Sequence, residues 1–380
     1  MKNKGITLLT VIFAAFFSIH SLSAADKGYD IDRKFQSAPG KKLIIDLDTG
    51  GAISITGKSG NEVNVKVHLT GSDSEDLKVD VEETSNGIEI NSTFHGNRNH
   101  YNASADLEIQ TPSRYDVDLK TMGGDVAIHN LEGNISGETM GGELDLNGLK
   151  GKIQLTTMGG EITVADSDLD GSVKTMGGDV LIRNVSGTMK GSTMGGDVRY
   201  ENATGGKVKG EVKVNSMGGD LNIADAPEGA SLDTMGGDIH VTSAKKFVEA
   251  KTMGGDIQLD SVDGSVEATT MGGDVKVRIT GDAEQGKGDV SLTSMGGDIE
   301  LTVPAGMAMN IDVETVYSER TTRKPKIVSD FPLEISEREE SGTKWHDKEI
   351  TMSGTGQTGN GKHHVKIRTV GGDIFLRKGN

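Results

Sequence analysis

The chain has 380 residues, no cysteine, and 57 acidic against 40 basic side chains, which gives a formal net charge of −17. The lack of cysteine excludes a disulfide framework and a lipid-modified N-terminal cysteine, and the negative charge argues against nucleic acid or anionic lipid as the main partner. Glycine is abundant, with 54 residues, and aromatic residues make up only 4%, a composition that favours thin, turn-rich repeats over a large globular core.

The first segment has the layout of a secretory signal peptide. Lys2 and Lys4 precede an apolar stretch, residues 6–17, and the small residues Ala24 and Ala25 follow it. The apolar stretch is shorter than the roughly 20 residues that a membrane-spanning helix needs. We therefore expect removal of residues 1–25, export of the chain, and no transmembrane span afterwards. The loss of two lysines would lower the net charge from −17 to −19.

Between residues 26 and 116 the sequence predicts β-strands without a fixed repeat. Apolar and polar residues alternate in residues 43–47, 63–67 and 77–81, which is the pattern of a half-buried strand. A Thr-Gly-Gly sequence at residues 49–51 resembles the motif that repeats farther along the chain. We predict that residues 26–116 form an N-terminal β cap and the first irregular coils.

A five-residue motif, Thr/Ser-Met-Gly-Gly-Asp/Glu, repeats along the middle of the chain. Seven of the nine intervals between its copies are 18 residues, and the other two are 23 and 24. A fixed period of this kind predicts a repeat architecture. The ten copies begin at Thr121, Thr139, Thr157, Thr175, Thr193, Ser216, Thr234, Thr252, Thr270 and Ser294.

Each repeat unit has the pattern of two short strands. In one unit, apolar residues lie two apart at Ile257 and Leu259, and again at Val266 and Ala268, which is strand spacing rather than helix spacing. One unit is too small to bury its own apolar side chains, so consecutive units must stack as parallel strands about 4.8 Å apart. We predict a single-chain parallel β-solenoid, or β-helix, of about 18-residue coils over residues 117–303.

The regular period does not continue into residues 304–380. This region holds the chain's one tryptophan, Trp345, and ends with a degenerate copy of the motif at residues 369–373. We predict C-terminal coils and a cap here, because the ends of a solenoid expose unpaired strand edges that need protection. The extra residues of the two long units, 205–207 and 282–286, are expected to loop out of the stack.

With its units laid out, the chain resembles an exported bacterial β-strand-repeat family of unknown function whose members often carry the label "putative adhesin". The likeness lies in residues 43–56, residues 105–112, the repeats, and residues 365–374. The resemblance implies a β-repeat fold, and the family has no agreed catalytic residues to carry over. This chain departs from the usual Ser-Gly-Asp turn by using Met-Gly-Gly-Asp.

In-register stacking would place each motif position in one row along the rod. We expect the Gly-Gly row to supply the positive φ angles of a tight turn. The acidic row is expected to accept hydrogen bonds from nearby backbone amides. Calcium binding is the alternative, although one carboxylate per coil is fewer ligands than calcium takes. The acidic row consists of Asp125, Glu143, Glu161, Asp179, Asp197, Asp220, Asp238, Asp256, Asp274 and Asp298.

The Met row has two interpretations. Strict alternation from Val266 and Ala268 points Thr270 inward and Met271 outward, whereas a β-bulge at the glycines would reverse this. We expect a buried row that fills the corner of each coil, because methionine adapts to irregular gaps. The alternative is an exposed apolar stripe that serves a partner or self-association. The row consists of Met122, Met140, Met158, Met176, Met194, Met217, Met235, Met253, Met271 and Met295.

The sequence predicts no catalytic, cofactor-binding or metal-ligating residues. It contains no Gly-x-Ser-x-Gly elbow and no phosphate-binding loop, and the adjacent His363 and His364 are expected on the cap surface. The uniform repeats favour a non-enzymatic adhesin or cell-envelope scaffold that binds a protein or glycan through its rows. A calcium-dependent polysaccharide-acting β-helix enzyme is the alternative. We expect a periplasmic, outer-surface or secreted location.

Overall fold

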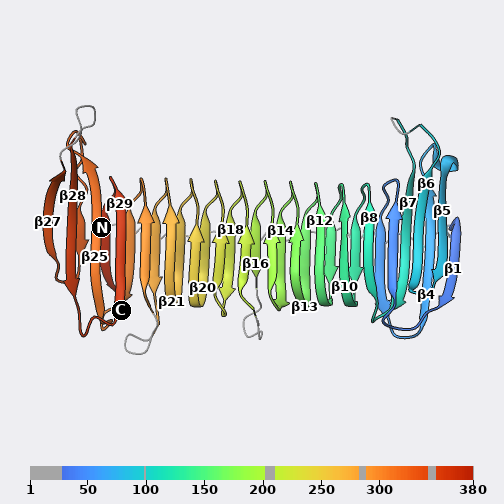
Figure 1. The fold of residues 1–380 in the computed structure, drawn as a ribbon, viewed down its shortest axis with the longest axis horizontal. Helices are drawn as coiled ribbons and strands as arrows, with labels where there is room; N and C mark the ends of the chain where they lie inside the picture. The colour runs from blue at the N-terminus through green and yellow to red at the C-terminus, as the bar shows by residue number, and fades with distance from the viewer. Residues whose placement is uncertain (1–27, 98–99, 202–209, 282–287, 341–347, 380) are drawn as a thin grey trace, which may run out of the picture.

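The computed structural model describes residues 28–97, 100–201, 210–281, 288–340 and 348–379 (Figure 1). The expected signal peptide, the residues inserted into the two long repeat units, and Trp345 lie outside these residues. The described chain forms thirty β-strands and one short 3-10 helix, η1 (Ser74–Asp76), so the predicted all-β class is confirmed. None of the described residues belongs to a helix long and apolar enough to cross a membrane.

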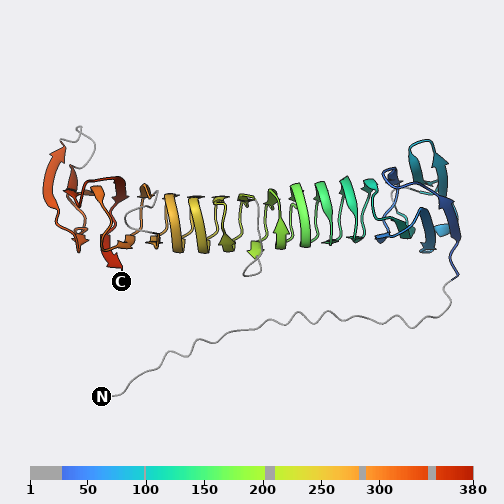
Figure 2. The same cartoon turned by 90° about the horizontal axis from the view of Figure 1, so that it is seen from below.

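The strands stack into a long rod with a cap at each end (Figures 1 and 2). A first face contains the strands that precede each motif, and a second face contains the strands that follow it. The first face has β8 (Asp116–Thr121), β10 (Glu132–Thr139), β12 (Lys150–Thr157), β15 (Met189–Ser192), β17 (Val212–Asn215), β19 (Ala230–Asp233) and β23 (Val290–Ser294). The second face has β9 (Val126–His129), β11 (Leu144–Asn147), β14 (Val180–Ser186), β16 (Val198–Glu201), β18 (Leu221–Ala226), β22 (Val275–Ile279) and β24 (Ile299–Pro304).

Three longer strands pass from the second face into the first without a break. These strands are β13 (Ile162–Lys174), β20 (Ile239–Lys251) and β21 (Ile257–Thr270). The first part of β13 pairs with β11, and its last part pairs with β12. A single strand therefore supplies both layers of one coil.

Consecutive coils pair in parallel and in register. Leu144 lies beside Ile162, 18 positions later, and where an insertion lengthens a unit the pairing resumes in phase, as Val266 beside Val290. The apolar residues of both faces point inward and form one buried core along the rod. The core exists only because neighbouring coils cover one another, since a single coil has too little apolar area to fold alone.

At the N-terminal end, the first coil of the sequence lies inside the stack. β2 (Lys42–Leu47) pairs with β8, and β3 (Ile53–Lys58) pairs with β9. On their other side lie β6 (Gly87–Phe94) and β7 (Ser104–Pro112), both parallel to them. The cap is completed by antiparallel strands, which are β1 (Ile31–Gln36), β4 (Glu62–Thr70) and β5 (Leu77–Thr84).

The C-terminal end has the corresponding arrangement. β29 (His363–Val370) and β30 (Ile374–Gly379) pair directly with β23 and β24 of the last repeat. The earlier strands β25 (Met309–Ser318) and β26 (Ile327–Ser329) lie beyond them. The antiparallel strands β28 (Glu349–Gln357) and β27 (Glu334–Glu340) close this end. The chain thus builds its cap first and then returns to fill the place next to the repeats.

The second glycine of each motif is needed mainly for close approach between coils, which corrects the expectation of positive φ angles. Gly124 and Gly142 have φ of +95° and +86°, but no motif glycine from Gly159 to Gly297 has a φ in the left-handed region. In these later copies, a Cβ on the second glycine would lie 1.8–2.3 Å from the carbonyl oxygen of the second glycine in the preceding coil. Only glycine permits that backbone contact.

We predict that Gly237→Ala destabilises the rod while Gly236→Ala does not. A Cβ at Gly237 would lie 2.1 Å from the Gly219 oxygen, whereas one at Gly236 would lie 3.5 Å from its nearest atom. Overpacking against fixed backbone should lower the free energy of unfolding by about 3 kcal/mol, and the control should stay within about 0.5 kcal/mol. Urea denaturation followed by circular dichroism measures both, and equal losses would contradict the steric explanation.

Candidate functional site

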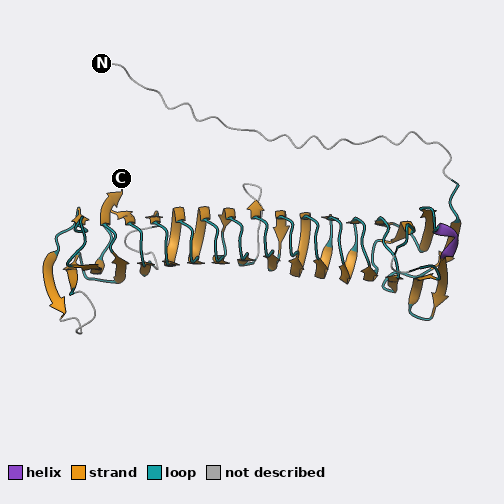
Figure 3. Ribbon diagram, turned by 90° about the horizontal axis from the view of Figure 1, so that it is seen from above, coloured by secondary structure: helices purple, strands orange, loops and turns teal. Residues whose placement is uncertain are grey.

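The ten motif copies lie where the chain turns from the first face to the second. Because the coils are in register, these turns line one edge of the rod, where loops are drawn in teal (Figure 3). We call this edge, from residues 121–125 to residues 294–298, the motif edge. Each motif position forms a separate row along it.

The Thr row is buried and forms the internal hydroxyl ladder that strict alternation predicts. The Thr252 hydroxyl donates to the carbonyl oxygen of Gly237 in the preceding coil at 2.9 Å and accepts from the Gly255 N–H at 3.2 Å. The same pair of bonds occurs in eight of the ten copies. In the first two copies, Thr121 and Thr139 donate to a carbonyl oxygen of their own coil. The row therefore satisfies backbone groups inside the turn.

The aspartates of the acidic row tie each coil to the next. Asp238 accepts the backbone N–H of Asp256 through Oδ1 at 2.8 Å, which confirms the expected use of these carboxylates. The distances of all such bonds lie between 2.7 and 2.9 Å. The aspartates that accept in this way are Asp125, Asp179, Asp197, Asp220, Asp238, Asp256, Asp274 and Asp298.

The two glutamates interrupt this series. Among the described residues, neither Glu143 nor Glu161 accepts the amide of the following coil, and we attribute this to the extra methylene group of their side chains. Burial raises the pKa of Glu161, and the neighbouring carboxylates of Glu143 and Asp179 raise it further. Carboxylate repulsion thus adds to burial at Glu161, in one of the two coils that lack the hydrogen bond.

The acidic row does not form a calcium cage in the described chain. No group of three or more histidine, aspartate or glutamate side chains there is arranged to hold a metal ion. Each aspartate also uses one oxygen for a backbone amide, and calcium takes six to eight oxygen ligands. The geometry gives the calcium alternative no support.

The Met row is exposed, so the expectation of a buried row was wrong. The ten side chains are 37–56% exposed, and Val370 continues the row at 44% in the coil beside the last repeat. The cause is the Thr row, because its hydroxyls take the inward position and bond the glycine carbonyls. The glycines do not reverse the alternation, and an apolar stripe runs along the motif edge.

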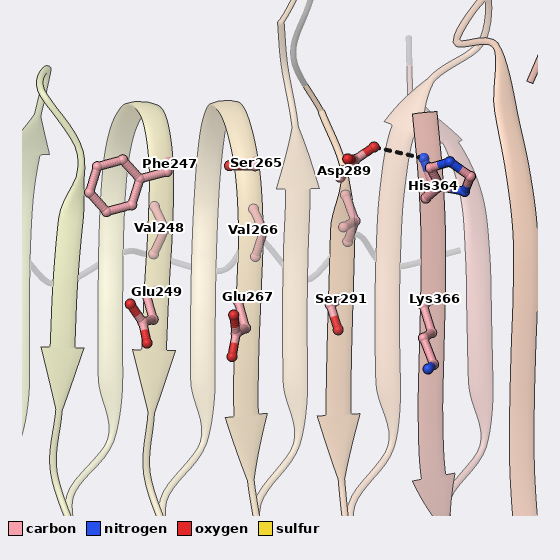
Figure 4. Close-up of a pocket in the computed structure, with 11 residues that line it drawn as sticks. Phe247, Val248, Glu249, Ser265, Val266, Glu267, Asp289, Ser291, His364 and Lys366 are labelled. Atoms are coloured by element: carbon pink, nitrogen blue, oxygen red, sulfur yellow. Dashed lines mark hydrogen bonds between the residues drawn. The ribbon is translucent and has the colours of Figure 1, made fainter. Parts of the chain in front are cut away.

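A shallow groove of about 540 Å³ lies on the outer surface near the C-terminal end (Figure 4). It is bordered by Glu249 and Glu267 on one side and by His364 and Lys366 on the other. Asp289 lies between them, where its Oδ1 accepts the His364 backbone N–H at 2.8 Å. This aspartate therefore has a structural partner, and the groove shows no nucleophile paired with a base.

The histidines within the described ranges do not assemble a site. His363 is only 4% exposed, so the expectation that both C-terminal histidines lie on the surface was wrong for this one. Its Nδ1 accepts the Gly288 N–H at 3.2 Å, and burial, followed by the charge of Lys362, lowers its pKa. Sequence reasoning also missed a hydrogen bond between the side chains of neighbouring coils, which joins His240 Nε2 and Asp260 Oδ2 at 2.8 Å. The 18-residue stacking offset was the only signal that could have indicated it.

The family model described as Toastrack DUF4097 matches residues 41–230 and residues 226–377, which confirms the resemblance seen in the sequence. No curated protein matches the chain.

Several solved structures show weak similarity. A "putative cell adhesion protein" from Clostridium sporogenes is 9% identical, with 92% of this chain and 99% of that chain covered and a TM-score of 0.18. A "putative adhesin" from Parabacteroides distasonis is 12% identical, with 73% and 98% covered and a TM-score of 0.32. A "putative adhesin" from Bacteroides fragilis is 14% identical, with 72% and 96% covered and a TM-score of 0.25. TM-scores this low do not establish a shared fold.

We predict that exchanging the two acids of neighbouring coils has opposite effects on stability. Glu161→Asp should place an acceptor where eight aspartates already bond the next amide, and Asp179→Glu should remove one such acceptor. A hydrogen bond at this edge is worth about 0.5–1 kcal/mol of unfolding free energy. Urea midpoints at neutral pH should therefore rise for the first variant and fall for the second, and shifts in the same direction would argue against the hydrogen-bond role.

We further predict that Glu161→Gln stabilises the chain at neutral pH. The folded-state pKa of Glu161 is raised above its ordinary value of 4.5, so the folded chain holds this proton more tightly than the unfolded chain does. The free energy of unfolding then falls as the pH rises from 4.5 through the raised pKa. Between pH 4 and pH 7, the thermal midpoint of the variant minus that of the parent should increase as the pH rises. A difference in thermal midpoint that does not change with pH would contradict the prediction.

Proposed function

Because the chain belongs to the Toastrack DUF4097 family, we propose that it is a non-enzymatic, exported adhesin or cell-envelope scaffold. Its stack of coils acts as a single-chain β-solenoid, with the caps at residues 26–116 and 304–380 and the repeats between them at residues 117–303. Residues 1–25 direct it out of the cytoplasm, to the periplasm, the outer surface or the medium.

The exposed Met row is the observation that carries this proposal. The second glycine, the threonine and the aspartate of the motif contact a neighbouring coil, as Gly237, Thr252 and Asp238 do. The methionines are instead 37–56% exposed. Val370 shows that the turn accepts another apolar residue at this position, so the stack does not require methionine. A long exposed apolar stripe is uncommon on a protein without partners, and methionine adapts to varied binding surfaces.

The motif edge also defines the chemistry of the partner. The acidic row lies three positions after the Met row in every coil, so negative charges run beside the apolar stripe. A protein or glycan that presents repeated apolar groups, with positive charge or hydroxyl groups beside them, would match this edge. The uniform face along the ten coils supports a binding rod rather than the polysaccharide-acting alternative.

We predict that five Met→Gln substitutions abolish binding to the cell envelope. Glutamine is close to methionine in size but polar, so it removes the apolar stripe and leaves the turn intact. Sedimentation of the purified chain with envelopes from its own bacterium should fall to background. The substituted residues are Met217, Met235, Met253, Met271 and Met295.

Ile335→Gln is the matched control, because Ile335 is 50% exposed but lies in the C-terminal cap, away from the motif edge. This variant should sediment like the parent chain. Undiminished sedimentation of the five-fold variant would overturn the assignment of the motif edge as the binding surface.

A further inference from the structure

The Met row is continuous over ten coils. The Met253 N–H donates to the carbonyl oxygen of Met235 at 3.2 Å, so the backbones of these two residues are stacked. The same stacking holds where the units are longer: a Cβ on Gly218 would lie 3.6 Å from the Met194 oxygen, and one on Gly296 would lie 3.5 Å from the Met271 oxygen. The row therefore has no gap, although two of its sequence intervals are 23 and 24 residues.

This spacing brings neighbouring thioether groups within reach of a shared metal ion. Paired strands lie about 4.8 Å apart, and all ten methionines emerge from the same position of the same turn. A metal–sulfur bond is about 2.3 Å long in zinc sites, so an ion held between two sulfurs separates them by about 4.6 Å at most. The methionine side chain has three rotatable bonds, which allows the small adjustment.

We propose that the Met row binds soft monovalent cations, Cu(I) and Ag(I), with each ion held between thioether sulfurs of consecutive coils. Thioethers are soft ligands and select Cu(I) over hard divalent cations. The chain has no cysteine that would compete for such ions. This proposal goes beyond the proposed function, because it depends on sulfur rather than on the apolar character of the stripe.

The acidic row provides electrostatic support for the proposal. Eight of the ten coils carry an aspartate that accepts an amide through Oδ1, and the other two carry a glutamate. Each coil thus places one carboxylate three residues from its methionine. A line of like charges creates a potential that attracts cations to the edge. Cations held along the Met row would in turn relieve the repulsion among these carboxylates.

Two variants with the same composition distinguish ions that are held between two sulfurs from ions that are bound by one sulfur. The ten sulfurs of the parent form nine neighbouring pairs, and each variant replaces five methionines with leucine. The alternating variant retains no neighbouring pair and substitutes Met140, Met176, Met217, Met253 and Met295. The contiguous variant retains four neighbouring pairs and substitutes Met217, Met235, Met253, Met271 and Met295.

Silver nitrate titrated into the chain in chloride-free buffer, followed by calorimetry, measures the binding without a redox change. The parent should bind several Ag(I) ions, and the contiguous variant should bind about half as many with unchanged affinity. The alternating variant should bind each ion more than about 100-fold more weakly. Losing a residue that only hydrogen-bonds to a metal ligand lowers metal affinity about 10–100-fold, and losing a ligand itself lowers it further. Anaerobic competition with bicinchoninate should give the same order of affinities for Cu(I) among the parent chain and the two variants.

An equal loss of Ag(I) binding in the two variants would overturn the proposal, because each sulfur would then bind an ion by itself. Undiminished binding by the alternating variant would overturn it as well. Circular dichroism and thermal midpoints verify that both variants fold. Since leucine preserves the apolar stripe, envelope sedimentation should survive in both variants, so failure of the metal proposal and failure of the proposed function give different results.

Discussion

The contact between the second glycine of one motif and the same glycine of the preceding coil sets the geometry of the whole rod. The two backbones approach so closely that a Cβ would lie about 2 Å from a carbonyl oxygen. At that separation, the Thr252 hydroxyl reaches the preceding glycine carbonyl and the Asp238 carboxylate reaches the following amide. The threonine must then point inward, which leaves the methionine pointing outward. One steric constraint thus fixes the direction of every side chain in the motif.

Much of this fold could be predicted from the sequence, because the pattern and its physical cause coincide. Apolar residues two apart, such as Ile257 and Leu259, become the buried side of a strand. The 18-residue period becomes the pairing offset between coils. The degenerate Thr-Val-Gly-Gly-Asp sequence is a related coil, in which Thr369 bonds the Gly297 carbonyl oxygen as a motif threonine would.

Other features could not be read from the sequence. Glycine satisfies both a positive φ angle and a close backbone approach, so the residue type alone does not reveal which of the two is required at Gly237. Met271 was expected inside because its apolar character was given more weight than strict alternation, and the carbonyl partner of Thr270 was not visible. The order of the C-terminal coils depends on pairing between residues far apart in the chain, such as Ile299 with Ile374.

The position of β29 and β30 has a consequence for the order in which the rod folds. These strands lie between the last repeat and the coil formed by β25 and β26, yet they follow both of them in the chain. The repeats can assemble progressively, because each new coil finds its predecessor already in place. The distal end can be sealed only when β29 and β30 are available to pair with the last repeat. Until they pair, the rod presents the open strand edges of β23 and β24, and such edges are a template for pairing with another chain.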